Sequence, residues 1–114
     1  MSRGLVLAIE TSCDETAVAV ADSHGDVVVS KVASQIELHS PYGGVVPELA
    51  SRNHSLNLRP LVEETLRASK LCLSDVDAVA ATSGPGLASS LLVGDTTAKA
   101  IALGLGRPFY SINH

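Results

Sequence analysis

The sequence predicts an α/β fold in which a five-stranded mixed sheet carries helices on its faces. The first observation is the order of the predicted segments: three strands, a helix, a strand, a helix and a strand. The second is the composition, because 46% of the residues are hydrophobic, mostly Ala, Val and Leu, and only 3% are aromatic. Small aliphatic side chains suit close packing of helices on a sheet. A length of 114 residues predicts one domain, 1–114.

Three short strands open the chain. Leu5 to Glu10 is an apolar run, and Thr16 to Ala21 and Val27 to Ser34 have the composition of strands. The polar segment 22–26 between the second and third strands is typical of a turn. These segments therefore predict an antiparallel β-meander.

A helix is predicted to begin at Pro47 and Glu48, because the first helical turn tolerates proline and favours an acid. Apolar residues at helical spacing extend it to about Ser69. Pro60 lies inside this helix and is a potential kink site.

The second half of the chain alternates strand and helix. The apolar segment Asp77 to Thr82 predicts a strand that is covered on both faces. A helical face from Leu87 to about Gly104 follows, with small residues at its middle, and Phe109 to Ile112 predicts the fifth strand. Right-handed crossovers complete the mixed sheet. Since no helix follows the fifth strand, we expect a lobe truncated before its last helix.

The turn between the first two strands is unusually polar. Glu10 to Thr16 holds carboxylates, hydroxyls and a thiol, where Gly or Asn would normally be enough. One interpretation is a self-capped hairpin tip. The other is a functional site in which hydroxyls and amides bind a phosphate, while a carboxylate holds a metal's water shell or positions a nucleophile.

A second motif, Ser83 to Leu87, joins a buried strand to a helix. It predicts a type II turn with Pro85 at the first central position and Gly86 at the second, where φ is positive. Such a turn directs the amides of the helix N-terminus above the sheet and offers an anion site. Many strand-to-helix turns contain Gly and Pro for steric reasons alone, so both interpretations stay open.

The histidines and charges give weaker signals. A structural, hydrogen-bonded role for His39 and His54 is favoured over a metal pair, and His24 is expected to be solvated. His114 stands at the carboxyl end of a predicted strand. A net charge of -4 and scattered arginines argue against a main RNA-binding surface in this segment. Two cysteines far apart and no membrane-spanning run predict a reduced, cytoplasmic protein.

Several segments together resemble one family. They are Ala8 to Thr16, His39, Tyr42 to Arg52, His54, Gly84 to Leu87 and Leu92 to Gly94. This combination is similar to TsaD, the tRNA N6-adenosine threonylcarbamoyltransferase family once labelled O-sialoglycoprotein endopeptidase (glycoprotease) and related to the KEOPS catalytic subunit. The resemblance implies the N-terminal lobe of an actin-like ATPase (ASKHA, ribonuclease H-like) fold, with the second lobe of the enzyme absent.

The resemblance also implies an activity. The family transfers a threonylcarbamoyl group from threonylcarbamoyl-adenylate to N6 of the tRNA adenosine beside the anticodon, with TsaB- and TsaE-type protein partners. By resemblance, Asp14 and Glu15 are catalytic, and Ser12, Gly84 and Gly86 bind substrate or nucleotide. The family binds iron or zinc, and His114 lines up with the first histidine of its His-x-x-x-His motif. The remaining ligands are missing from this chain.

Three alternatives remain. A non-catalytic scaffold of TsaB type shares the lobe but lacks the Ser-Cys-Asp-Glu turn, and an actin-like small-molecule kinase would have Gly and Lys in that turn. The sequence contains no His-Glu-x-x-His motif and therefore does not support the old peptidase label. The third alternative is an inactive fragment. We expect such a fragment to hold no stoichiometric metal and to self-associate through an uncovered apolar face.

Overall fold

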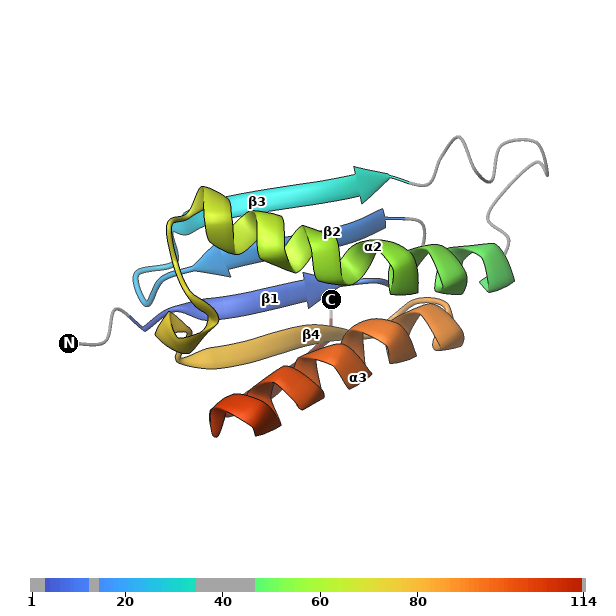
Figure 1. The fold of residues 1–114 in the computed structure, drawn as a ribbon. Helices are drawn as coiled ribbons and strands as arrows, with labels where there is room; N and C mark the ends of the chain where they lie inside the picture. Colours follow the sequence, from blue (N-terminus) through green and yellow to red (C-terminus); the bar gives the residue numbers. More distant parts are fainter. Residues whose placement is uncertain (1–3, 13–14, 35–46, 114) are drawn as a thin grey trace.

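The computed structural model describes residues 4–12, 15–34 and 47–113. Figure 1 shows a sheet with helices packed against it. The elements in chain order are β1 (Val6–Glu10), β2 (Glu15–Ala21), β3 (Val27–Ser34), α2 (Pro47–Ala68), the short 3-10 helix η2 (Leu73–Asp75), β4 (Ala78–Gly84), α3 (Ala88–Leu105) and β5 (Phe109–Asn113).

The strands form one five-stranded mixed sheet with the order β3-β2-β1-β4-β5. β1 pairs antiparallel with β2, and β2 pairs antiparallel with β3. β4 pairs parallel with both β1 and β5. The meander, the element order and the mixed sheet that the sequence predicts are therefore confirmed. β4 and β5 each run beyond their predicted ends.

Both helices lie on the same face of the sheet. Figure 1 shows α2 and α3 side by side in front of the strands, and the two helices contact each other. The reason is topological. The crossover from β3 to β4 and the crossover from β4 to β5 move across the sheet in the same direction, so two right-handed crossovers place their helices on one side. We call the other side, which none of the described helices covers, the open face.

The hydrophobic core lies between the helices and the sheet. Alternate residues of β1 and β2 point into it, as the period of a strand requires. Leu7, Val18, Val20 and Val79 are fully buried there. Residues of α2 and α3 complete the core, namely Leu58, Leu61, Val62, Ala98 and Ala102.

The open face is built mainly from small residues. Ala8, Ala17, Ala19 and Ala80 line a groove of about 170 Å³, with Ile112 at one side. The five residues Ala78 to Thr82 are all buried, as the sequence predicts. The helices α2 and α3 explain the burial of those β4 side chains that point towards them, but not of those on the open face. On the open face the alanines are small enough to be screened by side chains of the neighbouring strands.

The helix ends follow the sequence signals. α3 ends at Gly106, which has a left-handed φ of 66° and whose N–H is donated to the carbonyls of Ala102 and Leu103. A left-handed residue favours glycine, so the predicted stop is confirmed. Pro60 lies inside α2. Within the described part of the chain, no helix is both long and apolar enough to cross a membrane.

Candidate functional site

The candidate site lies where β1 and β4 end and α3 begins. Parallel strands bring their carboxyl ends to one edge of the sheet, and open α/β sheets bind ligands at that edge. The turn after β1, of which Thr11 and Ser12 are described, therefore meets the β4–α3 turn, residues 85–87. Three consecutive residues join this edge: Glu10 contacts β4, Thr11 contacts α3, and Ser12 contacts the β4–α3 turn.

Ser12 is in direct contact with the β4–α3 turn. The backbone N–H of Leu87 donates to the carbonyl of Ser12 at 2.8 Å. A Cβ on Gly86 would lie 2.5 Å from the same carbonyl oxygen, which no real side chain tolerates. Glycine is therefore required at position 86 for close approach.

This finding corrects the predicted turn type. Gly86 does not have a positive φ, whereas Gly4, Gly25 and Gly106 do. The peptide bond between Gly84 and Pro85 is cis. A type II turn over Pro85 and Gly86 is therefore wrong, and the glycine serves the contact with Ser12 instead.

Thr11 enters the hydrogen-bond ladder of α3. Its hydroxyl donates to the carbonyl of Ser90 at 2.6 Å and accepts the N–H of Gly94 at 3.1 Å. These two groups are four residues apart, the spacing of an α-helical hydrogen bond. A Cβ on Gly94 would lie 2.5 Å from the Thr11 hydroxyl. Gly94, one of the small residues predicted at the middle of this helix, thus leaves room for the Thr11 hydroxyl.

Glu10 joins the turn to β4. One carboxylate oxygen, Oε1, accepts the N–H of Ser12 at 2.5 Å, and the other, Oε2, accepts the hydroxyl of Thr82 at 2.5 Å. Both side chains lie on the open face at the carboxyl ends of neighbouring strands, beside Ile112 of β5. The carboxylate thus bridges β1, its following turn and β4.

The N-terminus of α3 is suited to an anion. Its N-cap, Leu87, provides no side-chain cap, and its first turn contains no acidic residue. The positive end of the helix dipole is therefore not offset by a carboxylate of the helix's own first turn. The hydroxyl of Ser90 in the same turn is buried and has no hydrogen-bond partner among the described residues.

The other predicted site residues are placed as follows. Glu15 is exposed and begins β2 opposite Ser34. Gly84 ends β4 opposite Asn113. Asp14 and His114 lie outside the described residues. The structure thus brings together Ser12 and Gly86, while the assigned catalytic and metal-binding roles stay predictions.

His54 has a structural environment. It is fully buried in α2, and its Nδ1 lies 2.7 Å from the hydroxyl of Thr16 in β2. The contact ties the helix to the sheet, which agrees with the favoured hydrogen-bonded role. His39 lies outside the described residues.

The described residues do not provide a metal site. Over 4–12, 15–34 and 47–113, no three His, Cys, Asp or Glu side chains gather as ligands. A metal site needs three or four ligands. The iron or zinc site that the resemblance implies would therefore need ligands from outside these ranges.

Sequence reasoning missed the partners of Glu10 and Thr11. Both belong to the polar turn that was singled out, but Thr82 and Ser90 lie more than 70 residues away, at separations of 72 and 79. The only signal was a Thr at the end of an otherwise apolar strand and a Gly at the middle of a helix.

A model of the family "tRNA N6-adenosine threonylcarbamoyltransferase", TsaD, matches residues 26–114. The chain belongs to the TsaD family. Proteins named tRNA N6-adenosine threonylcarbamoyltransferase from Agrobacterium fabrum and Symbiobacterium thermophilum are 57% and 50% identical over 113 and 114 residues. These matches cover 96% and 100% of this chain. The chain spans about a third of each relative, 31% and 33%.

The TsaD chain also resembles a solved structure, YeaZ from Pseudomonas aeruginosa. The TM-score is 0.74 at 27% identity, over 99% of this chain and 44% of that one. This similarity supports the actin-like ASKHA lobe. YeaZ is a TsaB protein, and the much higher identity of this chain to the TsaD relatives separates it from the TsaB-type alternative.

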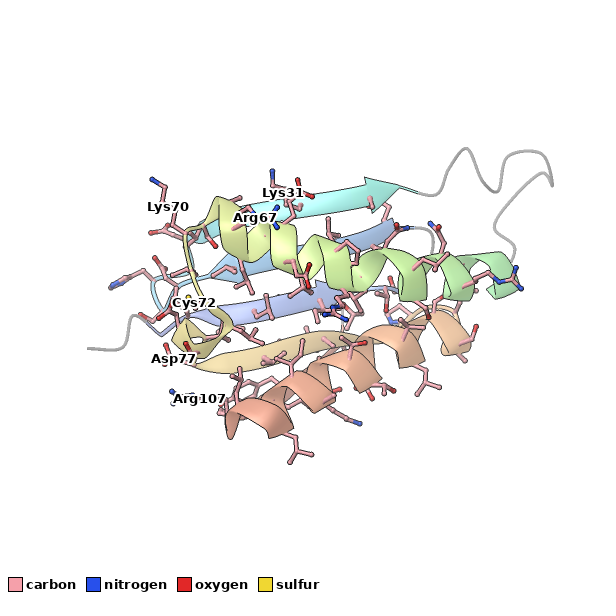
Figure 2. All side chains as sticks on the ribbon, in the orientation of Figure 1. Lys31, Arg67, Lys70, Cys72, Asp77 and Arg107 are labelled. Carbon is pink, nitrogen blue, oxygen red and sulfur yellow. The ribbon has the colours of Figure 1, made fainter. Side chains whose placement is uncertain are left out.

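The cations that the structure describes are spread over the surface of this TsaD chain. Figure 2 shows Lys70 and Arg107 near the end of the sheet where β1 and β4 begin, opposite the candidate site. Arg59 and Lys99 are paired with carboxylates on their own helices. A continuous basic surface beside the site is therefore not formed by these residues.

Proposed function

We propose that this chain is the N-terminal lobe of a two-lobed enzyme that transfers the threonylcarbamoyl group from threonylcarbamoyl-adenylate to N6 of the tRNA adenosine beside the anticodon. The observation that carries the proposal is the family match over residues 26–114, together with 50 to 57% identity to relatives of that name. Because the chain spans about a third of those relatives, the lobe alone is expected to be inactive.

The geometry supports a division of roles at the carboxyl edge. In the reaction, the adenosine amine attacks the carbamoyl carbon, the bond from that carbon to the phosphate oxygen breaks, and AMP leaves while the amine loses a proton. The N-terminus of α3, with Gly84, Gly86 and Ser12 beside it, suits the departing phosphate. Asp14 and Glu15 follow Ser12 by two and three positions. They are the carboxylates that would orient the amine and take its proton.

His114 is the residue we propose as the first ligand of the metal ion, with the other ligands provided by the rest of the longer enzyme. A divalent ion bound there would supply Lewis-acid polarisation of an oxygen in the substrate.

The expected partners are tRNA and two proteins, of TsaB and TsaE type, in the cytoplasm. The structural similarity to YeaZ, a TsaB protein, supports a TsaB-type partner.

The test uses the longer chain, supplied with its partner proteins, threonylcarbamoyl-adenylate and tRNA. Mass spectrometry of the digested tRNA should detect N6-threonylcarbamoyladenosine, and Asp14→Ala should abolish it without lowering the melting temperature. Full transfer by a folded Asp14→Ala variant would remove Asp14 from the mechanism. No transfer by the wild-type enzyme would refute the proposed activity.

A further inference from the structure

We propose that Glu10 is a positioning residue for the transfer reaction. Its side chain holds the turn after β1 and the end of β4 in one fixed arrangement. The inference rests on the proposed function. It begins from the two contacts of a single carboxylate, to the N–H of Ser12 and to the hydroxyl of Thr82, both at 2.5 Å.

A carboxylate suits this position for a chemical reason. Both of its neighbours donate a hydrogen bond, and an ionised carboxylate is an acceptor with two oxygens. Charge-assisted hydrogen bonds are short and stronger than neutral ones. Glu10 is partly buried, so water competes less for these contacts than it does at an exposed residue.

The contacts of Ser12 transmit this restraint to the anion-binding end of α3. The N–H of Ser12 is held by Glu10, and its carbonyl is held by the N–H of Leu87 at 2.8 Å. One residue therefore links the Glu10 carboxylate to the residue that precedes α3. Asp14 follows Ser12 by two positions, so the chain enters the catalytic segment from an anchored point. Misplacement of reacting groups by about 1 Å can cost 100-fold in rate.

Thr82 gives the restraint its second anchor. It is buried near the end of β4, two residues before Gly84. Glu10 therefore ties the strand before the hairpin turn to the strand before the β4–α3 turn. The two turns approach closely at Gly86 and Ser12, where a Cβ would not fit. Without the two Glu10 hydrogen bonds, we expect the distance between the turn after β1 and the β4–α3 turn to increase.

The experiment compares Glu10→Gln and Glu10→Ala in the longer enzyme, measured for kcat, for KM of tRNA and for hydrogen exchange at the Ser12 and Leu87 amides. The glutamine side-chain oxygen can still accept the N–H of Ser12, and its N–H can donate to the hydroxyl oxygen of Thr82. The kcat should therefore stay within about fivefold of wild type. Alanine loses both contacts. We expect kcat to fall about 100-fold, KM to change little, and both amides to exchange faster.

Thr82→Val removes only one anchor and keeps the shape of the residue, so its kcat should fall between those of wild type and Glu10→Ala. The matched control is Glu64→Ala, an exposed carboxylate on α2, which should change neither kcat nor exchange. Melting temperatures report any general loss of fold. If Glu10→Ala does not fold, Glu10→Gln and Thr82→Val decide the question.

The proposal is overturned if Glu10→Gln is as inactive as Glu10→Ala while its Ser12 and Leu87 amides exchange as in wild type, because the charge would then act directly in the chemistry. Wild-type kcat in Glu10→Ala, or unchanged exchange at Ser12 and Leu87, also overturns it. If the wild-type enzyme transfers nothing, the proposed activity fails. The exchange comparison would still decide whether Glu10 restrains the two turns.

Discussion

Gly94 lies where the hydroxyl of Thr11 enters α3. Glycine in a helix normally lowers stability by about 1 kcal/mol relative to alanine. Here the missing Cβ makes room for a hydroxyl that bonds both Ser90 and Gly94. The lower helix stability at Gly94 is thus offset by a contact between the turn after β1 and α3. Helix propensity alone does not reveal this contact.

Gly94→Ala should lower the free energy of unfolding by about 1 to 3 kcal/mol, because the new Cβ would lie 2.5 Å from the Thr11 hydroxyl. Urea unfolding measures this change. The matched control is Gly104→Ala in the same helix, where a Cβ meets nothing within 4 Å. The control should raise stability by up to about 1 kcal/mol. A gain of similar size at both positions would contradict the role of Gly94.

Residue identities carried part of this information. The polar turn after β1 and the small residues of α3 are visible in the sequence, and so is a preference for a structural His54. What the sequence does not contain is the pairing of Thr11 with Ser90, or of His54 with Thr16. Such pairs depend on how β1 and β2 are placed against the helices, which is a property of packing.

The elements were predicted closely because each has a strong local signal. β3 has the predicted bounds, and α2 and α3 end within one residue of the predicted positions. The β4–α3 turn was predicted wrongly in its backbone. Turn rules treat Pro85 and Gly86 as a local pair, while the conformation there is set by contact with Ser12, which is distant in sequence.

Gly86→Ala is expected to destabilise the fold by about 1 to 3 kcal/mol, since its Cβ would meet the backbone of Ser12 at 2.5 Å and backbone atoms yield less than side chains. Gly84→Ala is the control, because a Cβ there meets nothing within 4 Å, and its effect should stay within about 0.5 kcal/mol. Thermal unfolding of both variants gives the comparison. Equal melting temperatures would show that the turn adapts easily.

At the scale of the whole molecule, the open face is the surface through which we expect the chain to associate. Exposed apolar side chains border it on both edge strands, with Val32 56%, Tyr110 54% and Ile112 46% exposed. The alanines of the inner strands, which lie between these edge strands, line a groove. A contiguous apolar surface of this kind favours association.

We therefore expect the 114-residue chain to self-associate through the open face, as a rising mass in light scattering with concentration. Ile112→Glu should shift it towards the monomer, because association would bury an unpaired charge. Leu103→Lys is the control, since Leu103 is 85% exposed on α3, on the other side of the sheet. A clean monomer at high concentration would contradict this expectation.

Metal binding should likewise depend on the longer chain. After dialysis, the 114-residue chain should contain no stoichiometric metal, because in the proposed site His114 is only one of several ligands. The longer enzyme should retain its ion and lose it in His114→Ala. Elemental analysis measures both. A tightly bound stoichiometric ion in the 114-residue chain would mean that other residues form a complete site.

The sequence by itself determined the order of the elements, the mixed sheet and the family, because strand and helix periodicities and the motif strings are local patterns. Only the tertiary structure decided that both helices share one face, that Gly86 is needed for contact rather than for a turn, and that Glu10 reaches Thr82. These features depend on which distant residues meet at the sheet edge. Contacts of that kind follow from the direction of the crossovers and from packing, neither of which a single segment encodes.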